Sequence, residues 1–140
     1  MKNILSILLI SIILFSCSNG DKRYHISETE NKGSEENPII FHNDKLCNGI
    51  IYTNYENGQL KGEGKYQNGN KIGEHKSWYE NGELKSLDIL IDGKKSGICR
   101  IWYENGQLMF EGQYKDGEMD GLFITYSEMG EKISEFSISP

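Results

Sequence analysis

The sequence lacks the excess of basic residues that proteins binding nucleic acids or anionic lipids carry. It has 15 Lys and Arg against 21 Asp and Glu, a formal net charge of −6 and a pI near 5.1. Because clustered Lys and Arg recognise both kinds of partner, we expect no nucleic acid to be bound, and anionic lipid is a poor candidate. The hydrophobic share is also low, at 36%. A thin fold with much surface is therefore expected rather than a deep two-layer core.

The patterns that indicate helices and enzyme sites are also missing. No segment keeps a 3.6-residue apolar period, and no glycine-rich phosphate loop precedes a helix. The sequence has three histidines. His25 and His42 lie near the N-terminus, and His75 stands alone in a predicted strand. Metal sites usually need three or four ligands at defined spacing, so a His42/Cys47 pair is a weak candidate. We predict no catalytic residue, no metal, no cofactor and no enzymatic activity.

Long apolar runs are absent beyond the first 15 residues. Ile4–Phe15 is apolar apart from Ser6 and Ser11, and Lys2 places a positive charge before it. This run is too short for a bilayer core, which takes about 20 residues, so we interpret residues 1–16 as a secretory signal peptide.

The end of that run, LFSC at residues 14–17, resembles a bacterial lipobox, in which a small residue precedes a cysteine that becomes acylated. The resemblance implies that Cys17 anchors the mature protein, since several acyl chains give stable membrane attachment. The residue after Cys17 is Ser18 rather than an acidic residue. In lipoproteins, this implies localisation to the outer membrane if the cell has one. We expect an exported protein of the bacterial envelope with its soluble domain on the periplasmic or outer side. An ordinary signal peptide with a chance cysteine is the alternative.

Residues 17–40 are polar, charged and almost free of aliphatic side chains, so we predict a disordered tether that carries the lipidated cysteine. Its stretch from Ser18 to about Pro38, a flexible chain of about 21 residues, spans a root-mean-square distance of about 25 Å. The tether would hold the folded domain, residues 41–140, away from the bilayer.

What the chain has in abundance is one repeated hexapeptide. YENGQL occurs at residues 55–60 and 103–108, and YENGEL occurs at 79–84. A fixed period of this kind indicates an array of supersecondary units, here at about 49–72, 73–96, 97–120 and a partial 121–140. Glycines keep the same 24-residue period in three series: Gly58, Gly82, Gly106 and Gly130; Gly69, Gly93 and Gly117; and Gly49, Gly73, Gly97 and Gly121.

Each unit has the pattern strand, turn, strand, turn. Asn57-Gly58 and its two counterparts predict two-residue type I′ turns, which need positive φ at both central residues. Asn68-Gly69, Asp92-Gly93 and Asp116-Gly117 mark the second turns. The segments between are rich in Tyr, Trp, Ile and Phe, as strands prefer. We therefore predict about seven or eight antiparallel strands.

This register assigns side chains to two faces, which should continue from unit to unit without a bulge. With a two-residue turn, Tyr79 faces Leu84 and Trp78 faces Lys85. Gly64 and Gly112 would make room for Ile51 and Cys99 on the more buried face, where His75 meets Asp88. That face also carries Tyr55, Tyr79, Tyr103, Leu60, Leu84, Leu108, Tyr66, Leu90 and Tyr114.

The other face carries Trp78, Trp102 and Tyr126, interleaved with charged residues such as Arg100 opposite Glu111. This stripe is either cross-strand packing or a binding groove, because Trp and Tyr are favoured interface anchors. On the same face the second unit has an apolar patch, where its neighbours have polar residues. A lid formed by residues 38–41 would cover the patch, or a partner would contact it. The patch consists of Leu87, Ile89 and Ile91.

The stretches WYENGQLMFEGQYKDGEMDG (102–121) and YENGQLKGEGKYQNGNKIG (55–73) resemble the MORN repeat variant, typical of bacterial proteins grouped as YwqK-like antitoxins. The resemblance covers about residues 49–133. It implies an all-β fold, with successive hairpins side by side in one elongated, twisted antiparallel sheet. It also implies an antitoxin or immunity role, although MORN arrays elsewhere act as membrane-associated or protein-binding modules. The second unit departs from the motif at Ser86–Asp88.

In this fold Cys47 and Cys99 lie two units and four residues apart, or about 19 Å along the sheet. A disulfide needs Cα atoms within about 7 Å, so we predict no bond between them.

The leading interpretation is a non-enzymatic, membrane-anchored repeat protein that binds another protein, such as an exported toxin, through the Trp78 and Trp102 face. The alternative is an envelope-associated structural protein that binds glycan or lipid headgroups. A hydrolase with an unrecognised site is a third hypothesis.

Overall fold

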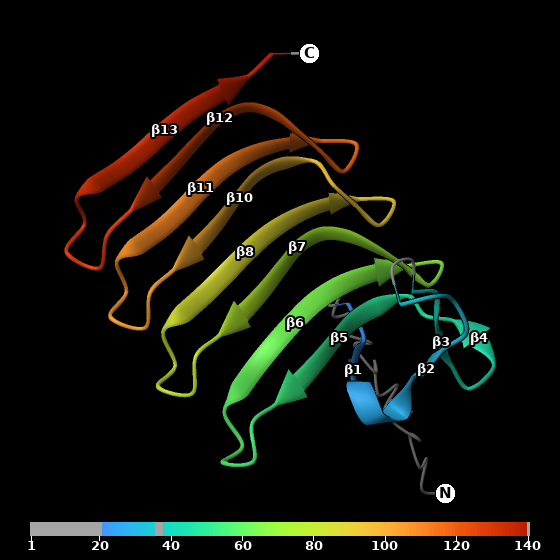
Figure 1. Ribbon diagram of the computed structural model, residues 1–140. Coiled ribbons are helices and arrows are strands. Elements are labelled where there is room, and N and C mark those ends of the chain that lie inside the picture. The colour runs from blue at the N-terminus through green and yellow to red at the C-terminus, as the bar shows by residue number, and fades with distance from the viewer. Residues whose placement is uncertain (1–20, 36–37, 140) are drawn as a thin grey trace, which may run out of the picture.

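A computed structural model describes residues 21–35 and 38–139. Its main element is a ten-stranded sheet in which successive hairpins lie side by side (Figure 1). No α-helix occurs in the described residues. The all-β fold of consecutive hairpins is therefore confirmed. Its eight repeat strands are β5 (Gly49–Asn54), β6 (Leu60–Gln67), β7 (Asn70–Trp78), β8 (Leu84–Ile91), β10 (Gly97–Trp102), β11 (Leu108–Lys115), β12 (Glu118–Tyr126) and β13 (Lys132–Ile138).

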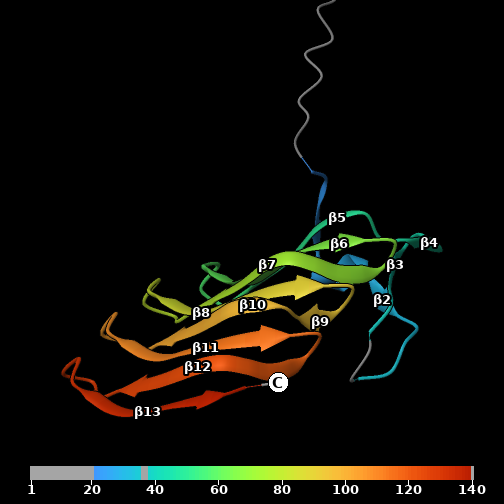
Figure 2. The ribbon, with the colours of Figure 1, turned by 90° about the horizontal axis from the view of Figure 1, so that it is seen from above.

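Most of the shorter elements lie at the start of the sheet, as the view in Figure 2 shows, and one strand, β9 (Lys94–Lys95), lies further along it. Strand β1 pairs in parallel with β5, and a separate three-stranded sheet has the order β2-β3-β4. Strand β9 pairs with the end of β8. These elements are β1 (Arg23–His25), the 3₁₀ helix η1 (Ile26–Glu28), β2 (Glu30–Asn31), β3 (Ile40–His42), β4 (Lys45–Leu46) and β9 (Lys94–Lys95).

The segment predicted as a disordered tether, residues 17–40, therefore contains regular structure from Arg23 onward. The physical reason is the open edge of β5, which offers unpaired backbone groups to the chain that precedes it. Tyr24 in β1 also packs against a buried cluster. The predicted signal peptide, residues 1–16, and Cys17 lie outside the described residues.

The Asn-Gly turns do not have the type I′ geometry predicted for them, whereas the second turns do have that geometry. At the Asn-Gly turns the loop has three residues, as in Glu80–Gly82, because the Tyr79 N–H donates to the Glu83 carbonyl at 2.8 Å. Gly82 has positive φ, but Asn81 does not, so the predicted type I′ turn is wrong here. Both central residues have positive φ in the second turns, as type I′ requires: Asn68-Gly69, Asp92-Gly93 and Asp116-Gly117.

The longer Asn-Gly loops introduce a one-residue bulge into each hairpin, so the predicted continuity without bulges is also wrong. Trp78 pairs with Leu84 rather than Lys85, which becomes the extra residue. Leu84 therefore lies opposite the tryptophan and not opposite Tyr79. The same shift pairs Asn54 with Leu60 and Trp102 with Leu108. Because the extra residue sits at the hairpin end, the middle of each strand keeps its predicted register, as the Ser77/Ser86 pair shows.

Side-chain hydrogen bonds join each hairpin to the next and explain why the hexapeptide repeats. The Tyr79 hydroxyl donates to the Trp102 carbonyl at 2.7 Å, and the Asn81 amide donates to the Glu104 carbonyl at 3.0 Å. Asn81 also accepts from the Glu83 N–H, which holds its own loop. Corresponding tyrosine bonds run from Tyr55 to Trp78 and from Tyr103 to Tyr126.

One face of the sheet, here called the core face, carries the buried side chains. It begins with a cluster in which Ile51 and Tyr66 of the sheet meet Ile40 and Cys47 from the preceding segment. Near the other end Phe123 is fully buried and contacts the rings of Tyr114 and Phe136. The opposite face, here called the outer face, carries Trp78, Leu87, Arg100, Trp102 and the residues aligned with them.

Two strand glycines of the core face, Gly64 and Gly112, make room for a different neighbour from the one predicted. A Cβ on Gly64 would lie 2.0 Å from the His75 ring rather than against Ile51. A Cβ on Gly112 would lie 2.5 Å from Phe123. The reason is that rings from the strand that follows, and not the one that precedes, lie over these glycines.

Cys47 and Cys99 are both buried free thiols, which confirms the predicted absence of a bond between them. Cys47 belongs to the cluster under β3, whereas Cys99 lies in β10. Burial raises the pKa of both thiols, so neither is poised for reaction.

Candidate functional site

The aromatic stripe predicted from the sequence lies on the outer face of the sheet. Lys76 pairs with Leu87, and Leu87 pairs with Arg100, so these residues share one face across three strands. Trp78 and Trp102 come two residues after Lys76 and Arg100, and therefore lie on that same face. The stripe occupies the last positions of three strands, and each member is half-buried: Trp78, Trp102 and Tyr126.

The apolar patch of the second unit lies beside this stripe. Leu87 and Ile89 are half-buried in β8, whereas Ile91 at the end of the strand is 59% exposed. Sequence reasoning missed Ile98 of β10, which is 42% exposed and alternates onto the same face. Its signal was available, because the aligned residue of the next unit is the aliphatic Leu122.

The predicted lid does not cover this patch. Residues 38–41 lead into β3, and Ile40 packs with Cys47, Ile51 and Tyr66 on the core face. The Ile40 N–H also donates to the Gly69 carbonyl at 2.9 Å, which fixes the segment beside the β6–β7 turn. The patch is thus left open by the described residues, while the preceding segment covers the core face at Ile51 and Tyr66 of the first two repeat strands.

Charged groups around the patch are paired with one another. The Arg100 guanidinium contacts the Glu111 carboxylate at 2.5 Å, as the predicted register requires. Lys76 contacts Glu74 at 2.5 Å, also on the outer face. These charges are already neutralised in pairs. The surface therefore offers a partner apolar and aromatic contact area, bordered by charged side chains that have partners within this chain.

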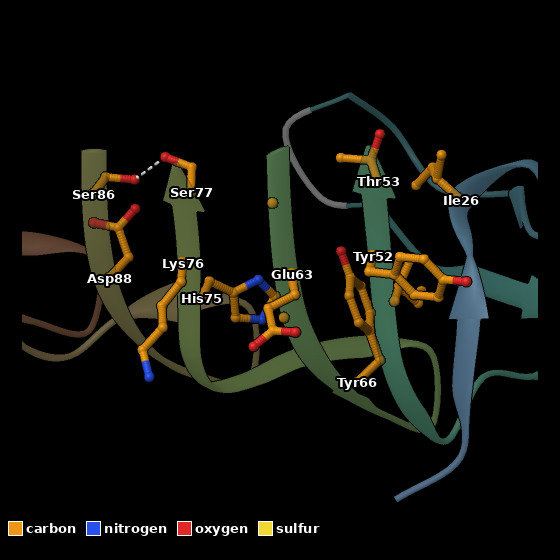
Figure 3. Close-up of a pocket in the computed structure, with 13 residues that line it drawn as sticks. Ile26, Tyr52, Thr53, Glu63, Tyr66, His75, Lys76, Ser77, Ser86 and Asp88 are labelled. Carbon is orange, nitrogen blue, oxygen red and sulfur yellow. Dashed lines mark hydrogen bonds between the residues drawn. The ribbon is translucent and has the colours of Figure 1, made fainter. Parts of the chain in front are cut away.

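A shallow trough of about 250 Å³ lies on the core face over β5 to β8 (Figure 3). Gly62 and Gly64 form its floor, and Ile26 of η1 borders it. The sequence explains its position, because Phe110 occupies in the third unit the column that Gly62 leaves empty in the first. Its polar lining on this face consists of Thr53, His75, Ser77, Ser86 and Asp88. Glu63 and Lys76 also border the trough, although the strand register places their side chains on the outer face.

His75 lies within this trough and pairs with Asp88, as predicted. Its Nε2 contacts the Lys65 carbonyl at 3.1 Å, and its ring meets Tyr66 edge-on at 5.4 Å. Burial lowers the pKa of His75 below its usual 6.5, and the nearby Lys71 acts in the same direction. The imidazole is therefore neutral at pH 7 and serves as a packed polar group.

Nothing in this arrangement resembles a metal centre or a membrane span. Residues 21–35 and 38–139 contain no group of three His, Cys, Asp or Glu side chains placed to hold a metal ion. The same residues include no helix with the length and apolar character needed to cross a bilayer.

The repeated hairpins with paired glycine turns match a known repeat family over part of the chain. Three segments of the chain match the MORN repeat variant. They are residues 48–68, 71–88 and 95–116, which correspond to the first three hairpin units. MORN repeats are commonly protein- or membrane-binding modules, consistent with a non-enzymatic repeat protein. No significant match was found among curated proteins or solved structures.

Proposed function

We propose that this MORN repeat chain is a non-enzymatic module that binds another protein through its outer face. The observation that carries the proposal is the juxtaposition of the tryptophan stripe with the apolar patch of the second unit. Trp78 and Trp102 lie on the same face as Leu87 and Ile89. Leu87 and Ile89 occupy columns where the neighbouring units have polar residues. Aromatic anchors beside aliphatic side chains are the usual composition of an interface centre.

The covering of the opposite face supports this choice. The preceding segment packs its apolar side chains against Ile51 and Tyr66, so the first strands have one face occupied and one face open. Ile91 and Ile98 stay exposed on the open face. A partner that covers them would remove apolar surface from water, at about 25 cal/mol per Å².

A pull-down from envelope extract tests this surface. Ile89→Lys and Trp102→Ala should each abolish capture of the partner, or weaken it at least tenfold. Ser86→Lys in the same strand, but on the core face, is the matched control and should retain capture. If both outer-face variants capture every protein that the unmodified chain captures, the surface is not the docking site.

We further propose that Cys17 is acylated and holds the module at the bacterial envelope, with the outer membrane as the expected site. The support is the LFSC sequence that closes the apolar run. Cells fed an alkyne analogue of palmitate should label the unmodified protein, and Cys17→Ala should lose both the label and the membrane association. An unmodified protein without label would contradict the lipid anchor.

An antitoxin or immunity role is the finer form of the proposal. An anchored, exported antitoxin lies in a different compartment from a cytoplasmic toxin, so its partner would be an exported toxin. Co-expression tests this, because the unmodified protein should protect cells from the captured partner and Ile89→Lys should not.

The trough on the core face favours a second candidate, an envelope protein that binds glycan. Hydroxyls of Ser77 and Ser86 lie 2.6 Å apart beside the Asp88 carboxylate, above a floor of glycine backbone. Such groups can hydrogen-bond the hydroxyls of a sugar ring. The acidic net charge disfavours anionic lipid headgroups. Binding of cell-wall glycan that survives Ile89→Lys but is lost in Gly62→Trp would favour this candidate over protein docking.

A further inference from the structure

The two ends of the sheet differ in how their edges are treated. At the first end β1 pairs with β5, and the small β2-β3-β4 sheet stands beside it. At the other end β13 pairs with β12 alone among the described strands, and all seven of its residues are exposed. Unpaired backbone groups along such a strand are a template for a further strand.

The middle of strand β13 lacks two features that usually keep an edge strand from pairing, a proline and a bulge. It contains no proline, and its described pairs with β12 run through the middle of the strand without a bulge. Phe136 is 47% exposed although it stacks on the fully buried Phe123, with ring centroids 5.2 Å apart. Ile133 is 66% exposed on the other face. The core-face row that includes Phe123 and Phe136 is therefore open on one side.

Two registers are centred on the middle of β13, with the two-fold axis at Glu135 or at Phe136, and only the second completes this row. A two-fold axis at Glu135 would place two like charges opposite each other, which is destabilising. An axis at Phe136 places the two phenylalanine rings together, Ser134 opposite Ile138, and Glu135 opposite Ser137. In that register no like charges face each other within the strand, and Lys132 keeps its ion pair with Glu135 at 2.7 Å.

We infer that β13 pairs antiparallel with β13 of a second copy of this chain, centred on Phe136. The two sheets then form one continuous sheet with both core faces on the same side, because the axis is perpendicular to the sheet. Phe123, Phe136 and their two symmetry mates form an unbroken aromatic row across the junction. The outer-face patch lies several strands away, so this pairing leaves the proposed docking surface free on each copy.

Cysteine cross-linking of the full chain in isolated membranes, with diamide as the oxidant, tests the pairing and its register. Phe136→Cys places two thiols opposite each other, with Cβ atoms about 4.5–5.5 Å apart. In Ile133→Cys the two thiols lie about 20 Å apart, because residue 133 pairs with residue 139. Non-reducing electrophoresis should show about tenfold more dimer for Phe136→Cys than for Ile133→Cys, given the reach of a disulfide.

A second pair of variants keeps the test valid if loss of the aromatic ring weakens the junction. Ser134→Cys and Ile138→Cys should cross-link when expressed together and not when expressed singly, because each lies opposite the other. Equal dimer for all positions, or dimer no greater than the unmodified chain gives, would overturn the inference. A cross-link from Phe136→Cys to a protein of different mass would assign the edge to another partner and would also overturn it.

Discussion

At the residue scale, two glycines on one strand differ sharply in what a side chain would meet. A Cβ on Gly64 would fall 2.0 Å from the His75 ring, whereas a Cβ on Gly62 finds its nearest atoms at 3.4 and 3.6 Å. The sequence showed that Gly64 makes room for a neighbour, but not which one. Gly64 pairs with Ile51 on one flanking strand and with His75 on the other. Which of the two side chains lies over the glycine depends on how the rings pack, and local sequence rules do not contain this.

Gly64→Ala should therefore destabilise the protein by about 1–3 kcal/mol, because the His75 ring must move from its place over β6. Gly62→Ala is the matched control in the same strand and on the same face. It should be neutral or slightly stabilising, since glycine weakens a strand interior. Urea unfolding of both variants, followed by circular dichroism, measures the difference. Equal stability of the two variants would show that His75 does not occupy this position.

The buried position of His75 also makes stability depend on pH. Its pKa is lowered in the folded state by burial, so the unfolded chain takes up this proton first as the pH falls below about 6.5. Stability is therefore fully present above that pH and declines below it, down to the folded pKa. The urea concentration at the midpoint of unfolding should decrease when the pH is lowered from 7.5 to 5.5. His75→Gln should make this decrease smaller. An unchanged pH profile in the variant would contradict the assignment.

At the scale of elements, the hairpins and their number were predictable, but the turn geometry was not. Asn-Gly has the φ preferences of a type I′ turn, and the sequence prediction used only that local preference. In the structure Asn81 instead accepts from the Glu83 N–H and donates to the Glu104 carbonyl of the next hairpin. This second bond depends on a residue 23 positions away, which local turn rules do not contain. The shift of Leu84 to a place opposite Trp78 follows from it.

The tyrosine bridges between hairpins should be measurable one at a time. Tyr79→Phe removes the bond to the Trp102 carbonyl and should cost about 1 kcal/mol of unfolding free energy. Tyr52→Phe is the control, because the described part of the chain offers its hydroxyl no hydrogen-bond partner. A loss of the same size in both variants would mean that the bridge contributes nothing specific.

At the scale of the whole molecule, the 24-residue period predicted an elongated single sheet because each unit repeats the same pairings. The N-terminal elements escaped prediction, since β1 and β2 are too short and polar to show a strand pattern. Their position decides which face of the first repeat strands is covered, and so which face of those strands is open. Of the candidate docking residues, the sequence identified Trp78 and Leu87. It missed Ile98, although the aligned Leu122 shows that an aliphatic residue recurs in that column.

Cysteine labelling reports on the integrity of the whole sheet. Cys47 and Cys99 lie at separate positions along the sheet and are both 2% exposed. Iodoacetamide should leave both unmodified in the native protein and modify both in urea without any reductant, as peptide mapping would show. Labelling of Cys99 alone under native conditions would indicate that the second half of the sheet opens independently. A requirement for reductant would indicate a disulfide.

The most direct test of the central claim compares one exposed isoleucine on each face of the same strand. Ile98 lies on the outer face and is 42% exposed, whereas Ile101 lies on the core face and is 37% exposed. A photo-cross-linking amino acid placed at each position in living cells should give a protein adduct at residue 98 and none at residue 101. An adduct at residue 101 alone, or at neither position, would contradict the proposal that this sheet binds its partner through the outer face.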